Sequence, residues 1–389
     1  MSELTEARWS ETKSALLEGL KGNRKSVMDV TLENTRKYIN ESASVGSTSA
    51  GNVATLNRVI LPVIRRVMPT VIANELVGVQ PMTGPVGQIH TLRVRYAEAS
   101  SGTTTTTAGE EALSPFKIAE AYSGDNSSTK AGSTSALEGT GGKKLSIQIL
   151  KQTVEAKSRK LSANWTFEAA QDAQSQQGID IEAEIMAALA QEITAEIDQE
   201  IIGSLVSLAG SAFNTFDQQA VSGTATFVGD EHAALAILIN RAANAIAQRT
   251  RRGAGNYAVV SPTALTILQS ATTSAFARTT EGTFEAPTNN KLVGTLNSAM
   301  KVYVNTYAAN DDVLVGYKGS SEADAPAFYC PYIPLMSSGV VLNPSTFEPT
   351  VSFLTRYGYV ELSNTASSLG NAADYLAKVA VTTANLSFA

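Results

Sequence analysis

The segment at residues 180–205 constrains the fold more than any other, because its large apolar side chains recur at strict four-residue steps. These residues are Ile181, Ile185, Leu189, Ile193, Ile197, Ile201 and Leu205. The spacing predicts one helix that begins after an Asp180 N-cap. A four-residue step exceeds one helical turn, so the apolar stripe winds slowly around the helix. About 26 residues at about 1.5 Å each give roughly 39 Å, which indicates a spine rather than a small-domain helix.

The stretch from Val63 to Tyr96 contains three predicted units and almost no groups that could do chemistry. Residues 63–77 have helical apolar spacing that is broken by Pro69. Residues 78–87 are rich in proline and glycine and predict a rigid loop. Residues 88–96 then alternate in the manner of a strand.

The strand predicted at residues 88–96 carries two arginines on one face. Its two faces are Ile89, Thr91, Arg93 and Arg95 on one side, and His90, Leu92, Val94 and Tyr96 on the other. The simpler interpretation is an ordinary half-exposed strand. The more specific interpretation is an arm that packs on another copy of the chain. We take Arg93 and Arg95 as candidate intersubunit contacts.

Two regions have unusual composition. Residues 1–41 hold 14 charged side chains and predict one or two exposed helices, followed by a Ser/Gly linker at residues 42–52. Residues 97–142 contain 16 Ser or Thr and 7 Gly, so they are expected to form a long loop or small excursion. This excursion would connect the 88–96 strand to a second strand at residues 144–157.

Residues 229–340 read as a separate α/β unit, within a 389-residue chain that is long enough for two or three domains. A helix is predicted at residues 232–249, and another begins with Pro262 after a Ser261 cap. Residues 347–362 are expected to return as β structure.

Composition argues against several classes of protein. A net charge of −6 and a pI of about 5.2 make a dedicated nucleic-acid binder a poor candidate, because neutralising phosphates needs clustered Lys and Arg. Cys330 is the only cysteine, which rules out an intrachain disulfide and is compatible with a reducing compartment. The N-terminal residues lack a signal-peptide pattern, and no apolar run is long enough to span a membrane.

No set of residues converges on catalysis or on a metal. His90 and His232 have no second ligand at metal spacing, and His232 is expected to be solvent-exposed or to cap a helix. Residues 139–144 only superficially resemble a phosphate loop. Arg249, Arg251 and Arg252 form one basic cluster, for which nucleic acid and a neighbouring copy are both open as partners.

The acidic residues of the long helix favour a solvated or subunit-facing side rather than paired catalytic carboxylates. They are Glu182, Glu184, Glu192, Glu196, Asp198 and Glu200.

Several long, co-linear segments carry a family resemblance. The sequence PVIRRVMPTVIANELVGVQPMTGPVGQI resembles the opening of the mature major capsid protein of T-even-like contractile-tailed bacteriophages. Further segments similar to that family lie at residues 154–178, 255–271, 302–335 and 347–358. The resemblance therefore extends over most of the chain from about residue 60 to residue 362.

The resemblance implies an α+β, HK-97-type capsid fold, no enzymatic activity and no cofactor. The domains it implies are a charged N-terminal arm and linker at 1–52, an N-terminal helix and hinge at 53–87, an extended β-arm at 88–157 with its excursion at 97–142, a peripheral domain at 158–228, an axial domain at 229–340, and a C-terminal return to the peripheral domain at 341–389. The excursion is shorter and more polar than the folded insertion that T-even members carry.

The resemblance also implies a function. Hexamers and pentamers of the chain would form a head shell around double-stranded DNA, with non-specific DNA contact only. Vertex, portal, scaffolding, prohead protease and decoration proteins are the implied partners, without a membrane, and assembly would occur in the cytoplasm of the host bacterium. Cleavage by the protease is predicted after Glu41, within Ile39-Asn40-Glu41.

Three alternatives to a major capsid protein stay open at the level of sequence. A capsid vertex paralogue belongs to the same assembly class. A tail or baseplate structural protein and a carboxylate-based hydrolase are less favoured, and the hydrolase would need a cleft with converging acids.

Overall fold

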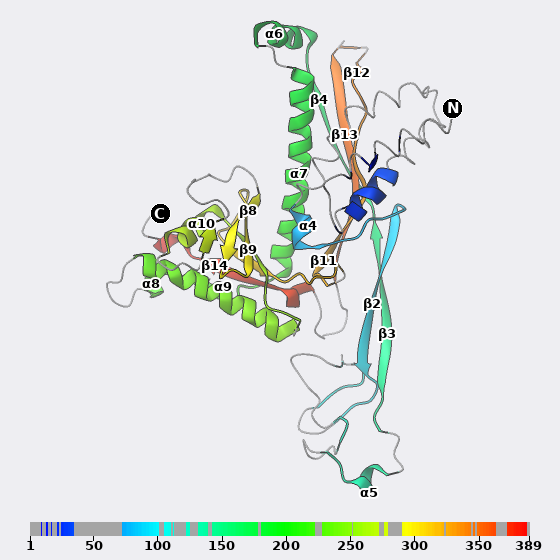
Figure 1. Cartoon of the computed structure of the whole chain (residues 1–389), viewed down its shortest axis with the longest axis vertical. Coiled ribbons are helices and arrows are strands. Elements are labelled where there is room, and N and C mark those ends of the chain that lie inside the picture. Colours follow the sequence, from blue (N-terminus) through cyan, green and yellow to red (C-terminus); the bar gives the residue numbers. More distant parts are fainter. Residues whose placement is uncertain are drawn as a thin grey trace. The chain divides into compact units, whose positions relative to one another are not determined.

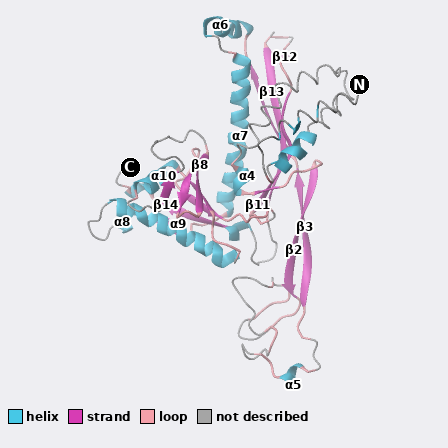
Figure 2. Cartoon of the chain, viewed as in Figure 1, coloured by secondary structure: helices cyan, strands magenta, loops and turns pink. Residues whose placement is uncertain are grey.

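The protein is described by a computed structural model (Figures 1 and 2). The described residues are 9, 13–14, 17, 22, 25–34, 72–100, 105–109, 112, 122–124, 131–138, 142–177, 180–221, 228–250, 252–271, 276–278, 290–322, 324–343, 345–346, 348–362 and 372–386. The chain forms two compact units. The first comprises Met1–Gly87, Val154–Gly203 and Phe328–Val360, and the second comprises Gln88–Thr153, Ser204–Ala327 and Glu361–Ala389.

The first unit contains a sheet of five described strands. They are β1 (Gly78–Val79), β4 (Lys157–Asn164), β11 (Ala327–Ser337), β12 (Val341–Leu342) and β13 (Pro349–Glu361). β1 runs parallel to β11, whereas β4 and β12 pair antiparallel with β13. Burial alternates along β13, where Val351, Phe353 and Thr355 are each 1% exposed. One face of this strand therefore belongs to the core, as period-2 patterning requires.

The long helix of the first unit is α7 (Ile181–Leu208), which confirms the predicted spine and extends it by one turn. Asp180 begins it as predicted, since its Oδ1 accepts a hydrogen bond from the Glu182 N–H at 3.1 Å. Burial of the apolar stripe is uneven. Ile197 and Ile201 are at most 2% exposed, whereas Ile181 and Ile185 are only half-buried.

Two shorter helices accompany α7 in this unit. The helix α6 (Phe167–Gln177) precedes it and has mostly exposed side chains, and α4 (Ala73–Leu76) precedes β1. Most of the helix predicted at residues 63–77 lies outside the described residues, as does the predicted cleavage site at Glu41.

The second unit contains a sheet of seven described strands in the order β5-β14-β10-β6-β9-β8-β7. Their bounds are β5 (Asn214–Phe216), β6 (Tyr257–Val260), β7 (Phe276–Arg278), β8 (Lys291–Leu296), β9 (Met300–Val304), β10 (Val313–Gly316) and β14 (Leu376–Val381). Helix α9 (Val228–Thr250) packs on β5, β10 and β14, and α10 (Pro262–Ser270) packs on α9 and β6. The short elements are α5 (Thr134–Leu137), α8 (Gln218–Val221), η1 (Ala372–Tyr375) and η2 (Thr383–Asn385).

The seven-stranded sheet draws on residues outside the predicted 229–340 range. β14 pairs with β10 and β5, although residues 341–389 were predicted to return to the peripheral domain. β11 lies in the sheet of the first unit instead. Strand pairing between distant segments decides these memberships, and local periodicity carries no information about the pairing partner.

Two local predictions in this unit have opposite outcomes. Ser261 caps α10 as predicted, because its Oγ accepts a hydrogen bond from the Ala264 N–H at 3.1 Å. The prediction that His232 is exposed or a cap is wrong, since it is 2% exposed and its Nδ1 lies 2.6 Å from Ser270 Oγ. Packing of α10 on α9 buries this ring, and burial lowers the pKa of His232.

Candidate assembly surfaces

The predicted arm is a two-stranded antiparallel ribbon made of β2 (Val86–Tyr96) and β3 (Leu145–Glu155), as Figure 1 shows. The Ala97 N–H donates to the Lys144 carbonyl at 3.0 Å beyond one end, and the Ala156 N–H donates to the Pro85 carbonyl at 2.8 Å beyond the other. Both bonds fit one alignment of the two strands, so the hydrogen-bond ladder between them runs without a bulge. Tyr96 therefore lies opposite Leu145.

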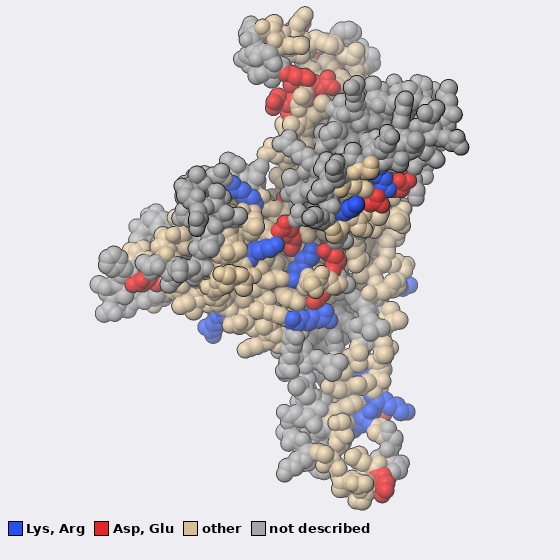
Figure 3. All heavy atoms as spheres, in the orientation of Figure 1, with Lys and Arg blue, Asp and Glu red and all other residues tan. Residues whose placement is uncertain are grey.

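One face of β3 exposes three large aliphatic side chains, which we call the arm row. Leu145, Ile147 and Ile149 are 54%, 68% and 66% exposed. Figure 3 shows that charged groups are sparse along most of the ribbon. A continuous row of exposed apolar side chains on a thin ribbon is unusual for a soluble monomer and is typical of interaction surfaces.

Part of the Ser/Thr-rich excursion folds back onto the far end of this ribbon. Tyr96, Ala112 and Tyr122 form a small buried cluster, in which the two tyrosine rings lie 4.5 Å apart. The Tyr122 hydroxyl donates to the Lys144 carbonyl at 2.5 Å, and Lys143 Nζ lies 5.3 Å from the Tyr122 ring centre. The excursion thus has a core of its own with the arm, which its polar composition did not predict.

The arginines predicted as intersubunit contacts lie in different settings. Arg95 is half-buried on β2 and its Nε has no hydrogen-bond partner among the described residues. Only the backbone of Arg93 is described, and Arg251 lies outside the described residues. Arg249 of α9 lies 5.6 Å from the Phe213 ring centre, and Arg241 lies 5.9 Å from the same ring.

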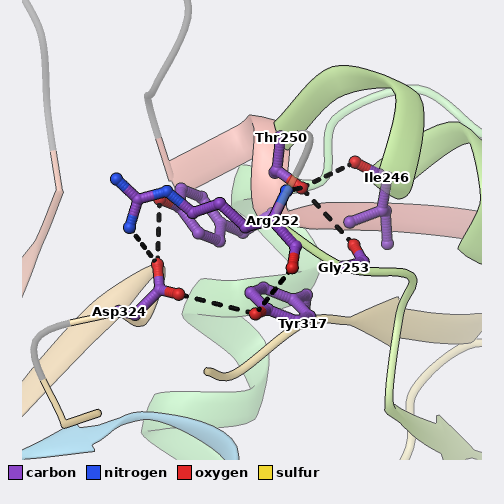
Figure 4. Close-up of polar contacts among 7 residues, drawn as sticks. Ile246, Thr250, Arg252, Gly253, Tyr317 and Asp324 are labelled. Carbon is purple, nitrogen blue, oxygen red and sulfur yellow. Dashed lines mark hydrogen bonds and ion pairs between the residues drawn. The ribbon is translucent and has the colours of Figure 1, made fainter. Parts of the chain in front are cut away.

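Arg252 has a partner in its own chain (Figure 4). Its Nη1 lies 2.6 Å from Asp324 Oδ1, and the same carboxylate accepts long hydrogen bonds from the hydroxyls of Tyr317 and Tyr375. Burial raises the pKa of Tyr375 to about 12, so this hydroxyl stays protonated as a donor. Arg252 is still 58% exposed, which leaves other guanidinium donors open to solvent.

A second arginine network was missed at the level of sequence. Arg159 of β4 binds Glu196 of α7 at 2.7 Å and Glu200 of α7 at 2.5 Å, and its Nε donates to the Tyr357 hydroxyl of β13 at 2.6 Å. Tyr357 also donates to Glu200. This network fixes α7 against β4 and β13. Only the four-residue spacing of Glu196 and Glu200 could have suggested a shared cation.

The network sets the ionisation of its members. Burial raises the pKa of the Glu200 carboxyl, but the hydrogen bonds from Arg159 and Tyr357 outweigh burial and hold that pKa below its ordinary value. Burial and the bond to Glu200 raise the pKa of Tyr357. At neutral pH the network therefore contains an ionised Glu200 and a protonated Tyr357.

The amino end of α7 is acidic and exposed. Figure 3 shows carboxylates gathered there, and the side chains of Glu182 and Glu184 are exposed. The predicted solvated or subunit-facing side is therefore present at this end only. Asp198 is 4% exposed, and Glu196 and Glu200 bind Arg159 of the same chain, because the carboxyl-terminal part of α7 packs within the subunit. Acidic side chains also favour this end of the helix because the backbone dipole is positive there.

The features described above are surfaces and contacts within an α+β body. Within the described parts of the chain, no three His, Cys, Asp or Glu side chains are grouped so that they could hold a metal ion. The described helices include none that is long and apolar enough to cross a bilayer. The chain has an exposed apolar row on the two-stranded ribbon, together with the helices and sheets of an α+β protein.

Comparison with known proteins identifies the family. The model of the major capsid protein Gp23 family matches residues 53–381, so the chain belongs to that family. The major capsid protein of Vibrio phage KVP40 is 31% identical, with 85% of this chain and 82% of that protein aligned. The major capsid protein of Enterobacteria phage T4 is 27% identical over 82% of this chain and 78% of that protein. A chain in the capsid of Myoviridae phage XM1 aligns over 80% of this chain and 92% of its own length, with 10% identity and a TM-score of 0.45.

The chain is therefore a major capsid protein of a tailed bacteriophage and not an enzyme. It builds the virion shell from copies of itself. The resemblance to T-even-like capsid proteins and the α+β capsid fold are confirmed, and the vertex, tail and hydrolase alternatives are not favoured.

Proposed function

We propose that copies of this chain associate as hexamers and pentamers around double-stranded DNA, and that the arm row of one copy packs on a second copy. The observation that carries this proposal is the exposure of Leu145, Ile147 and Ile149 on a ribbon that has little core of its own. Burying one such side chain stabilises a contact by about 1.5–3 kcal/mol. In a shell, the same contact recurs in every copy.

The test replaces the arm row by polar residues in the full chain. We expect the triple variant Leu145→Ser, Ile147→Ser, Ile149→Ser to keep the circular dichroism spectrum of the subunit but to lose shell formation, measured by sedimentation and electron microscopy. The matched control is Gln148→Ser, which changes an exposed residue of the same strand outside the row. Normal shells from the triple variant would contradict the proposal.

Charged and polar surfaces supply further proposed contacts. Arg93, Arg95, Arg249 and Arg252 remain candidates for contact with a neighbouring copy, as does Arg251. The Arg252 pairing with Asp324 makes it a weaker candidate than Arg95, whose Nε has no partner in the described residues. The half-buried amino half of α7 around Ile185 is a second apolar candidate.

Family membership supports a proposal for further partners. We propose that the shell meets portal, vertex, scaffolding and decoration proteins, and that it contacts the packaged DNA without sequence specificity. Assembly would take place in the cytoplasm of the host bacterium. A prohead protease is proposed to cut after Glu41. The intact mass of the subunit from mature virions checks this cut, and a full-length mass would reject it.

A further inference from the structure

The register of the arm determines where its backbone hydrogen-bonding groups point. Ala97 and Lys144 face each other as a hydrogen-bonded pair, as do Pro85 and Ala156 at the other end of the ladder. In an antiparallel ladder the bonding direction alternates with each residue. Even-numbered residues of β3 therefore direct their N–H and C=O groups toward β2. Odd-numbered residues, from Leu145 to Thr153, direct theirs away from it.

The outer edge of β2 is partly covered by the chain itself. The Gly109 N–H donates to the Tyr96 carbonyl and the Ala112 N–H donates to the Val94 carbonyl, each at 2.8 Å. The excursion thus pairs with the exposed edge of β2 near the far end of the ribbon. These two bonds also confirm the alternation, because both acceptors are even-numbered residues of β2 that point away from β3.

The outer edge of β3 has no such cover in the described part of the chain. β3 pairs with β2 alone in a two-stranded sheet, over 11 residues. A long edge of this kind is a template for an added strand. The residues whose backbone groups point outward are also those that carry the arm row, so an added strand would gain main-chain bonds beside an apolar contact. Lys144 and Lys151 are exposed on either side of the row, a placement typical of edges that must avoid indiscriminate pairing.

We propose that a second copy of this chain adds an extended segment to the outer edge of β3 as a third strand of the arm. The occupant is another copy because the chain belongs to a family whose members build shells from themselves. This inference rests on the proposed role of the arm and adds the mode of binding. The arm row supplies side-chain contact, and the odd-numbered backbone groups of β3 supply the register.

The test removes one outward N–H group while leaving the β2–β3 ladder intact. Proline has no N–H and is tolerated on an edge strand where that group faces outward. The variant is Lys151→Pro, with Lys151→Ala as the side-chain control, and a second pair is Thr153→Pro with Thr153→Ala. We expect the proline variants to reduce the yield of shells by about fivefold or more relative to their alanine controls, since each loses a backbone hydrogen bond to the neighbour.

Two readouts keep the inference testable. Circular dichroism and thermal unfolding of the unassembled subunit show whether each proline variant folds. Hydrogen exchange of the unaltered protein supplies an independent measurement, in which the Lys151 and Thr153 amides should exchange rapidly in the subunit and slowly in the shell. Equal shell yields from folded Lys151→Pro and Lys151→Ala, or rapid exchange of these amides in shells, would overturn strand addition.

The outcomes separate this inference from the proposed function. If the triple serine variant of the arm row abolishes shells while the folded proline variants assemble normally, side-chain contact stands and strand addition fails. If the triple serine variant also assembles normally, the arm contact itself fails.

Discussion

At the scale of single residues, the Arg159 network joins positions that are far apart in the chain. Arg159 lies 37 and 41 residues from Glu196 and Glu200, and 198 residues from Tyr357. Its three partners come from one helix and one strand of the first unit. Loss of this side chain would leave Glu196 and Glu200 as neighbouring like charges on α7.

We predict that Arg159→Ala lowers the free energy of unfolding of the subunit by about 1–2 kcal/mol, because the network is partly exposed and its ion pairs are screened. Urea unfolding measures this. Lys160→Ala is the control, since that side chain is exposed on the same strand. An unchanged midpoint for Arg159→Ala would show that the network contributes nothing to the subunit.

Glu200 predicts a pH dependence of stability. Its pKa is lowered in the folded protein by Arg159 and Tyr357, with Lys157 as a further nearby cation and Glu196 bound to the same arginine. The stabilisation is therefore full above the ordinary carboxyl pKa of about 4.3, and it is lost as the pH falls through the lower folded value.

The corresponding experiment compares the natural chain with Glu200→Gln. We expect the difference in unfolding free energy between them to be constant near neutral pH and to shrink below a pH of about 4.3. Urea unfolding of the subunit over that range measures it. A difference that does not change with pH would show that Glu200 is not held ionised by its partners.

Local chemistry of single residues was partly predictable from sequence. The Asp180 and Ser261 caps follow from residue type and position next to a periodic segment, and both form in the structure. The burial of His232 was not predictable, because it depends on the last turn of α10, 38 residues away. The Arg159 network likewise required knowledge of which strands lie beside α7.

At the scale of elements, the apolar stripe of α7 is buried unevenly. It is buried from Leu189 to Leu205, whereas Ile181 and Ile185 in the first two turns are only half-buried. The four-residue spacing predicted the helix but not this division, since every position of the stripe has the same residue type. Packing within one subunit buries the stripe from Leu189 onward.

We predict that Ile201→Ala lowers the free energy of unfolding of the subunit by about 2–5 kcal/mol, as expected when a fully buried side chain leaves a cavity. Ile185→Ala should cost less, because its side chain is partly exposed before assembly. Urea unfolding of both variants decides this. Equal losses would mean that the first half of α7 is as tightly packed as the second.

The arm was also only partly predictable from the sequence. The alternation of residues 88–96 predicted a strand, and the second strand was placed within one or two residues of β3. The cover on the outer edge of β2 depends on bonds from Gly109 and Ala112, within a segment whose composition predicted only a loop. The described residues place no such bonds on the outer edge of β3.

At the scale of the whole molecule, the family match determines what the chain does. The chain acts through surfaces that meet other copies of itself. The α+β class, the long helix and the arm were predictable, because periodicity and the resemblance specify them. The membership of β14 in the seven-stranded sheet was not, because strand pairing is a property of the folded chain.

Copies of this chain associate with one another into the lattice of a virion shell. Electron microscopy of the purified, assembled protein tests this association most directly. We expect closed shells or sheets with hexagonal packing of the subunits. Tubes, or single particles that never form a lattice, would contradict it.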